Sequence, residues 1–156
     1  MAQTDDVLKL ENQVCFALVV AARNVVSMYR PVLDPLGITH PQYLVMLALW
    51  EESPRSLGSL AAALVMEPAT LSPIVKRLEA LGLVRRTRRT SDERIVDVEP
   101  TAAGTALRER ALDVPTQVMD MIGLTAEELT TLREWLRPFT SPSGAAASAI
   151  EKERPT

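Results

Sequence analysis

The sequence predicts a mainly α-helical protein with one small β-hairpin, and three observations support that fold class. Apolar residues recur at helical spacing over most of the chain. Capping and stop signals divide these stretches into separate helices. Between residues 83 and 98, β-favouring residues instead flank a short polar tip, which predicts two antiparallel strands. With 156 residues, 47% of them hydrophobic, the chain fits one compact domain or one protomer of an oligomer.

The first helix is expected from Asp6 to Met28. It contains the nine-residue apolar run Val14–Ala22, and its apolar residues occupy more than one stripe, so we expect several of its sides to be buried. A domain of this size rarely buries a helix on several sides, whereas a partner subunit would. Pro31, Pro35 and Gly37 are then expected to break the chain.

A helix-turn-helix is predicted next. The capping-box pattern Thr39–Gln42 predicts the start of a core helix through Tyr43–Trp50. Ser56 can cap a short helix over residues 57–64, and an amphipathic helix follows over Ala69–Leu81. Two short helices in succession suggest a helix-turn-helix.

The hairpin and the C-terminal helices complete the expected order of elements. The strands are Leu83–Arg86 and Arg94–Val98, and the hairpin that they form after a helix-turn-helix would be a wing. Thr101 caps a helix over about residues 102–121 that bends near Pro115, and a last helix covers about residues 125–139. We expect residues 141–156 to be disordered.

The charge of the chain is unevenly distributed. The net charge is −3, yet seven basic and three acidic residues fall between Lys76 and Arg94. That window carries +4, which leaves −7 elsewhere. A solvated, arginine-rich hairpin is one interpretation. The helix-turn-helix beside it favours the other, a surface that binds double-stranded DNA.

A winged helix-turn-helix places its second helix in the major groove, and wing arginines reach phosphates or the minor groove. For each candidate, a solvated charge or a helix cap is the alternative. Arg85 and Arg86 fit backbone contacts or salt bridges better. The residues that we expect to bind DNA are Thr70, Ser72, Lys76 and Arg77 in the helix, and Arg88, Arg89 and Arg94 at the wing tip.

Two prolines leave open which bases this helix would read. If Pro68 is the first helical residue, Pro73 lies inside the helix and bends it. If the regular helix begins nearer Thr70, the amide missing at Pro73 costs little.

Cys15 is the only cysteine, which excludes an intramolecular disulfide. The single histidine leaves no conventional zinc site, and no phosphate-binding glycine loop or cofactor box is visible, so we expect no metal and no cofactor. Acidic residues stand where a secretory signal would be basic, and the apolar run is too short to span a bilayer. We therefore expect a cytoplasmic protein without membrane contact, whose thiol stays reduced unless an oxidant reaches it.

Several segments resemble a known family. Leu71–Val84, Asp92–Arg94 and Pro100–Gly104 resemble the MarR-type winged-helix regulators. Within that family, the chain is similar to the organic hydroperoxide resistance regulators (OhrR) of the one-cysteine class, through Leu10–Leu18, Tyr29–Asp34 and Pro41–Leu47. The resemblance extends from about Asp6 to Phe139.

The resemblance implies a single protomer over residues 1–140. In it, a winged helix-turn-helix (about residues 40–100) lies between dimerisation helices (about residues 6–30 and 101–140), and Asp92 supports the wing. The protein would be a homodimer that represses a peroxidase gene from a pseudo-palindromic operator until an organic hydroperoxide oxidises Cys15.

The resemblance also implies that hydroxyl groups stabilise the reactive thiolate, at Tyr29 and at position 40. Tyr29 lies 14 residues beyond Cys15, which along a straight helix is about 21 Å. Only a partner chain could therefore bring Tyr29 to the thiol. Position 40 is His40 instead of tyrosine. Its imidazole could donate to the thiolate and make sensing depend on pH near neutrality, or it could face solvent at a helix start.

Without a second cysteine, a Cys15 sulfenic acid could form a mixed disulfide with a small thiol, a sulfenamide, an overoxidised acid or a bridge between chains. Added bulk would move the winged helices away from the spacing of successive major grooves, about 34 Å. Alternatively, Cys15 is a small buried hydrophobe, and the regulator responds to a small lipophilic or phenolic ligand. A one-cysteine thiol peroxidase is disfavoured, because the sequence has no loop that would activate the cysteine, so we expect no enzyme.

Overall fold

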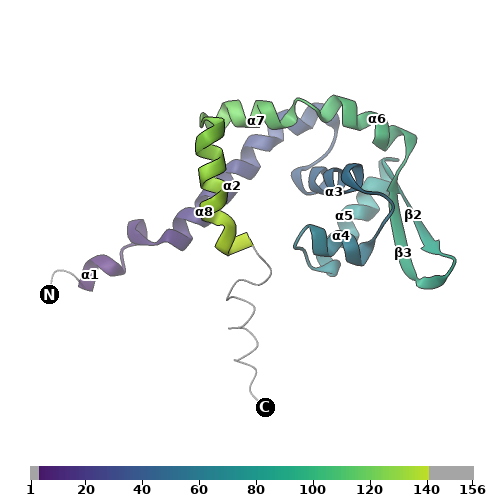
Figure 1. The fold of residues 1–156 in the computed structure, drawn as a ribbon, viewed down its shortest axis with the longest axis horizontal. Coiled ribbons are helices and arrows are strands. Elements are labelled where there is room, and N and C mark those ends of the chain that lie inside the picture. Colours follow the sequence, from purple (N-terminus) through teal and green to yellow (C-terminus); the bar gives the residue numbers. More distant parts are fainter. Residues whose placement is uncertain (1–3, 141–156) are drawn as a thin grey trace, which may run out of the picture. The chain divides into compact units, whose positions relative to one another are not determined.

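The computed structural model describes residues 4–140, so the disorder predicted for residues 141–156 lies outside the described residues. The chain divides into two compact units, residues 1–122 and 123–156. In the second unit the described helix is α8 (Ala126–Thr140). The first unit (Figure 1) contains, in chain order, α1 (Thr4–Val7), η1 (Leu10–Asn12), α2 (Val14–Leu33), η2 (Asp34–Leu36), α3 (His40–Glu51), β1 (Arg55–Ser56), α4 (Leu57–Ala63), α5 (Pro68–Ala80), β2 (Val84–Arg89), β3 (Asp92–Pro100), α6 (Ala102–Ala111) and α7 (Val114–Ile122).

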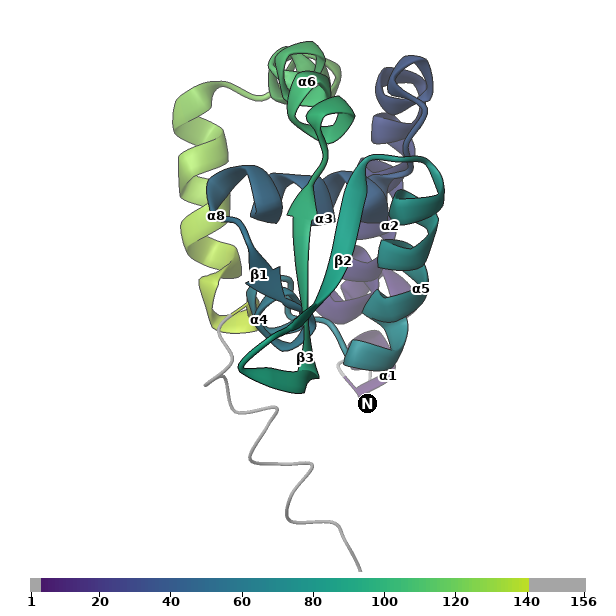
Figure 2. The same ribbon diagram turned by 90° about the vertical axis from the view of Figure 1, so that its right-hand side faces the viewer.

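The described residues are mostly helical, with one small antiparallel sheet of order β1–β3–β2, which confirms the predicted fold class. Strands β2 and β3 form the predicted hairpin, and β3 lies between the other two strands (Figure 2). The sequence did not predict β1, because two residues are too few to show an alternating pattern. This strand places Arg55 opposite Val98 and Ser56 opposite Asp97.

Helices α4 and α5 form the predicted helix-turn-helix, and the chain bends by 111° between them. Ser56 caps α4, since its hydroxyl accepts a hydrogen bond from the Ser59 amide at 3.0 Å. Helix α5 begins at Pro68 and contains Pro73, so the first of the two interpretations of its start is the observed one. The helix tolerates Pro73 because three side chains of its inner face are completely buried, namely Leu71, Val75 and Leu78.

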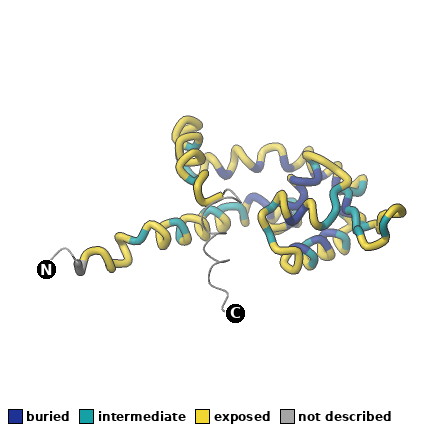
Figure 3. Tube along the Cα trace, turned by 60° about the horizontal axis from the view of Figure 1, so that its bottom comes forward, coloured by how far each residue is buried: buried dark blue, intermediate teal, exposed yellow. Residues whose placement is uncertain are grey.

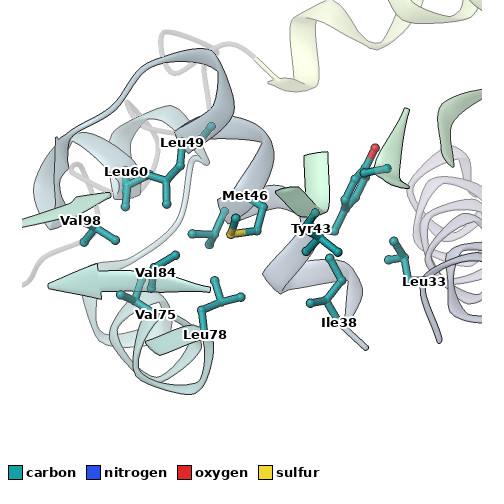
Figure 4. Close-up of a cluster of buried hydrophobic side chains, with 14 of the residues drawn as sticks. Leu33, Ile38, Tyr43, Met46, Leu49, Leu60, Val75, Leu78, Val84 and Val98 are labelled. Atoms are coloured by element: carbon teal, nitrogen blue, oxygen red, sulfur yellow. The ribbon is translucent and has the colours of Figure 1, made fainter. Parts of the chain in front are cut away.

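The hydrophobic core lies between the helix-turn-helix, α3 and the sheet (Figure 4). Helix α3 contributes Tyr43, Met46 and Leu49, all of them buried. Its predicted capping box is present, since the Gln42 side chain accepts a hydrogen bond from the Thr39 amide at 2.9 Å. The core thus fixes the position of α5 and of the hairpin relative to α3.

Helix α6 is held against this core at Gly104. A Cβ atom at this position would lie 2.0 Å from the carbonyl oxygen of Leu83 and 3.2 Å from Cε of Met46, so only glycine allows the approach. The Gly104 carbonyl accepts a hydrogen bond from the Trp50 indole at 3.0 Å, and the Gly104 amide donates to the Thr101 cap at 3.1 Å.

Helix α2 differs from its prediction at both ends. It begins at Val14, after two short helical segments, and continues through Pro31 to Leu33. The prediction that Pro31 breaks the chain was therefore wrong. Burial of Val32 and Leu33 directly after the proline offsets its missing hydrogen bond.

The segment Val14–Leu36 is long enough and apolar enough to cross a membrane, judged by length and composition alone. The expectation that the apolar run is too short to span a bilayer therefore does not extend to the helix that contains it. Most of α2 is exposed in a single chain (Figure 3), although its C-terminal part packs along α7. The predicted helix over residues 102–121 is also interrupted, because α6 ends at Ala111 and Pro115 lies in the first turn of α7, where it needs no amide partner.

Candidate nucleic-acid interface and thiol site

The side of α5 that faces away from the core carries four of the residues predicted to bind DNA. Thr70, Lys76 and Arg77 are exposed and Ser72 is half-buried. Within residues 4–140, no carboxylate forms an ion pair with Lys76 or Arg77. Both cations are therefore available to phosphates.

The outer face of the hairpin, which we define as Arg85, Thr87, Arg89, Asp97 and Glu99, consists largely of ion pairs. Arg85 lies opposite Glu99 across the strands and pairs with its carboxylate. Arg89 donates two hydrogen bonds to Asp97, at 2.9 and 2.6 Å. The Asp97 carboxylate has its pKa lowered, mainly because it accepts hydrogen bonds from Arg89.

The opposite face of the hairpin is directed toward α5. There the Arg86 guanidinium donates to the Glu79 carboxylate at 2.8 Å, which ties the wing to the end of α5 and lowers the pKa of Glu79. The ion pairs of Arg85 and Arg86 agree with the structural roles expected for these two residues.

At the wing tip, Asp92 organises Arg94. The Asp92 carboxylate accepts hydrogen bonds from the Arg94 amide at 3.1 Å and from its guanidinium at 3.0 and 3.2 Å. The Arg94 side chain is nevertheless 91% exposed. Arg88 donates only to the backbone carbonyl of Glu93, at 3.0 Å, and forms no ion pair among the described residues.

The predicted charge of this region is too high as a description of the folded surface. The sequence window ended at Arg94, but the strand register brings Asp97 and Glu99 back opposite the basic strand β2. Counting them reduces the charge from +4 to +2. Of the seven basic residues between Lys76 and Arg94, those without a carboxylate partner among the described residues are Lys76, Arg77 and Arg88.

The structure separates the three predicted sensor residues into two places. Cys15 lies in the first turn of α2 and is exposed in the single chain. Tyr29 lies near the other end of α2, about 21 Å farther along the same helix. Its ring contacts His40 at a centroid distance of 4.6 Å and Tyr43 at 5.8 Å. One chain therefore brings Tyr29 and His40 together and leaves Cys15 apart from both.

The aromatic cluster consists of Tyr29, His40 and Tyr43, and burial changes the ionisation of the last two. Desolvation lowers the pKa of His40 below its ordinary value of 6.5, so its imidazole is neutral at pH 7. Desolvation and the neighbouring Tyr29 raise the pKa of Tyr43. His40 and Tyr43 can thus donate hydrogen bonds without carrying charge.

Known proteins share both the sequence and the fold. Residues 38–96 match the MarR family. An organic hydroperoxide resistance transcriptional regulator of Bacillus subtilis (strain 168) is 39% identical over 131 residues, which cover 84% of this chain and 89% of that protein. The chain belongs to the MarR family.

Two solved structures add detail to this assignment. Reduced AbfR bound to DNA superposes with a TM-score of 0.72 at 33% identity, and covers 88% of this chain and 95% of that one. Overoxidized AbfR bound to DNA superposes with a TM-score of 0.71 at 34% identity, over 89% of this chain and 97% of that one. MarR-family proteins are DNA-binding regulators of transcription, not enzymes, and this MarR-family protein is a transcriptional regulator with the winged-helix fold.

A cavity of about 460 Å³ lies beside the aromatic cluster of this MarR-family protein. Helix α2, η2 and the start of α3 supply its walls, which include Val26, Arg30, Leu33, Ile38 and His40. Cys15 is not part of this lining. The lining combines apolar surface with the Arg30 cation, the Asp34 carboxylate and the His40 imidazole.

Sequence reasoning missed two groups of residues in this regulator. Tyr43 belongs to the aromatic cluster and Arg30 lines the cavity, and nothing in their local pattern distinguishes them from core and surface residues. Asp97 and Glu99 are the partners of the wing arginines. The alternation of the strands could have indicated them, since cross-strand neighbours share one face.

Proposed function

We propose that this regulator is a homodimeric, cytoplasmic repressor that leaves its operator when an organic hydroperoxide oxidises Cys15. The observation that carries the proposal is the separation of Cys15 from Tyr29 along the exposed apolar helix α2, with His40 of α3 beside Tyr29. A second copy of α2, running antiparallel across a two-fold axis, would place the partner's aromatic cluster beside Cys15 and cover the exposed apolar residues of α2. The 39% identical hydroperoxide resistance regulator supports this choice of inducer.

The chemistry needs an ionised thiol. Cys15 lies in the first turn of α2, where unpaired backbone amides favour an anion. Its thiolate attacks one peroxide oxygen, the O–O bond breaks, an alcohol leaves after taking a proton, and the cysteine becomes a sulfenic acid. A small thiol then displaces water from the sulfenic acid and leaves a mixed disulfide.

The mixed disulfide supplies the step that releases DNA. Its bulk inside the dimer interface would rotate the two winged helix-turn-helix units away from the spacing of successive major grooves. A sulfur that gains only oxygen atoms adds less bulk, and overoxidized AbfR is found bound to DNA. The proposal therefore assigns release to the thiol adduct.

Fluorescence anisotropy on DNA from upstream of the protein's own gene tests this function. One equivalent of cumene hydroperoxide per chain, with a small thiol, should abolish binding of the wild type, and a reductant should restore it. Cys15→Ser should bind equally well with and without the oxidant. Loss of binding in both proteins, or in neither, would contradict the proposal.

The contribution of the aromatic cluster is tested separately, by the rate at which peroxide consumes the Cys15 thiol. Tyr29→Phe removes the hydroxyl donor and should slow the reaction about tenfold or more. Tyr43→Phe removes a hydroxyl from the same cluster but from a side chain that is 2% exposed in its own chain, so it should leave the rate unchanged. Equal rates for Tyr29→Phe and the wild type would remove Tyr29 from the site.

A second candidate function rests on the cavity beside His40. A small phenolic or lipophilic ligand could occupy its 460 Å³ and shift the winged helix-turn-helix with Cys15 incidental. Release of DNA by a simple phenol or by benzoate, equally in the wild type and in Cys15→Ser, would favour this function over redox sensing.

A further inference from the structure

The outer face of the hairpin contains an arginine whose charge is already satisfied by the protein. Arg89 makes two nearly parallel hydrogen bonds with Asp97, at 2.9 and 2.6 Å. A phosphate would be bound by the same two-pronged geometry, so carboxylate and phosphate compete for one guanidinium. Arg89 therefore has to give up Asp97 before it can bind a phosphate through these two N–H groups.

The two side chains are held unequally. The Asp97 side chain is 20% exposed and lies in the middle of the sheet, opposite Thr87 on β2 and opposite Ser56 on β1. The Arg89 side chain is 42% exposed and follows the register shift after Arg88. The carboxylate is thus the fixed partner, and the arginine is the one that could turn toward DNA.

The other cations of the predicted interface provide the contrast. In the described chain Arg88 has no carboxylate partner, nor do Lys76 and Arg77 on α5. Arg94 has Asp92 as its partner but is 91% exposed at the tip. Of the three wing-tip arginines, Arg89 is the one bound to a half-buried carboxylate of the neighbouring strand.

We propose that Asp97 masks Arg89 and thereby limits the affinity of the wing for DNA of any sequence. This inference rests on DNA binding by the protein, and it names Asp97 as a residue that sets the electrostatic part of the affinity for DNA. Non-specific affinity depends on how many phosphates are neutralised, whereas sequence is read at the base edges. Masking one arginine removes one phosphate contact from the complex with any duplex and leaves base readout unchanged, so it lowers the salt-dependent part of the affinity for operator and other DNA alike.

The test measures the affinity of the reduced protein for a scrambled duplex as a function of salt, without peroxide, so that it does not depend on the Cys15 switch. Asp97→Asn should bind this duplex at least about threefold more tightly, and its salt dependence should become steeper by about 0.9 in log–log slope, the value for one added phosphate contact. Arg89→Gln alone should keep the wild-type slope, because that charge is already masked. The double variant Asp97→Asn/Arg89→Gln should return to the wild-type slope.

Glu109→Gln is the matched control, because it removes the same charge from an ion pair on α6, outside the hairpin. It should leave the slope unchanged. Thermal unfolding of each variant verifies the fold. The salt slope of Arg89→Gln tests the masking even if Asp97→Asn does not fold. An unchanged slope for Asp97→Asn, an equal increase in Glu109→Gln, or a shallower slope for Arg89→Gln alone would overturn the proposal.

Discussion

Helices α2 and α3 are both rich in apolar residues, yet a single chain buries them to very different extents. Six of the 12 residues of α3 are buried, against two of the 20 residues of α2. Figure 3 shows this difference along the chain. Helix α3 finds its partners within the chain, in α4, α5 and the sheet.

The exposed apolar stripe of α2, which we define as Phe16, Val19 and Val26, needs a surface from outside the chain. Contiguous apolar patches of this kind on soluble proteins mark interaction sites. A bilayer would suit the length of the helix, but the chain is a MarR-family regulator with Arg23 and Arg30 on α2. A second copy is the surface that our account predicts.

The largest expected effect concerns the packed helix α3, at its contact with Gly104 of α6. Gly104→Ala should lower the free energy of unfolding by about 3 kcal/mol, because the added Cβ would overlap the Leu83 carbonyl and press on Met46 of α3. Urea denaturation measures the change. Gly58→Ala is the control, since its Cβ would meet nothing closer than 3.9 Å in helix α4, and it should stabilise by about 0.5–1 kcal/mol. Equal effects of both variants would contradict the packing described here.

The next prediction concerns the exposed helix α2. Val19→Glu should weaken self-association by about 2 kcal/mol, close to a thirtyfold increase in the dissociation constant, and leave the circular dichroism of the chain intact. Sedimentation velocity measures the association. Val65→Glu makes the same change at a valine that is 71% exposed in the helix-turn-helix, and it should not alter self-association. If both variants associate like the wild type, the stripe on α2 is not the interface.

A smaller effect is expected in the helix-turn-helix, at a residue with a strained backbone. Val65, between α4 and α5, has a φ of 50°, a conformation that β-branched residues rarely adopt. Val65→Gly should therefore stabilise the fold by about 1 kcal/mol, measured by thermal unfolding. Ala63→Gly, two residues earlier in α4, should destabilise it by a similar amount. Destabilisation by both glycines would show that Val65 is not strained.

The smallest effect is expected where α2 meets α3, at the contact between Tyr29 and His40. Because burial lowers the pKa of His40 below 6.5, the unfolded chain binds this proton more readily than the folded one. The free energy of unfolding is therefore undiminished above pH 6.5, where His40 is neutral in both states. It declines as the pH falls below 6.5 toward the lowered pKa of His40 in the folded chain. Since His40 is the only histidine, His40→Gln should remove the decline in urea denaturation between about pH 7 and pH 5.5. The same decline in the variant would assign it to other groups.

Local signals predicted most of the fold because their causes are local. Caps at Ser56 and Thr101 and the Thr39–Gln42 capping box involve residues three apart, and each is present in the structure. The hairpin followed from residue type and a polar tip. Strand β1 did not, because it exists only through its pairing with β3.

The parts of the candidate site that sequence could not supply depend on contacts between distant residues. The partners of Arg85 and Arg89 follow from strand register, which a count over a sequence window ignores. The contact between Tyr29 and His40 requires that α2 continue through Pro31, where a local rule predicted a break. The burial of Cys15 requires a second chain and stays a prediction.

Native mass spectrometry of the protein with a duplex from upstream of its own gene, titrated with hydroperoxide and a small thiol, tests the central claim most directly. A single spectrum reports the number of chains per duplex and the chemical state of Cys15 in the bound and free proteins. Our account predicts two chains of 17.1 kDa per duplex with Cys15 reduced, and thiol adducts only in protein free of DNA. One chain per duplex, or adducts equally abundant on and off DNA, would contradict it.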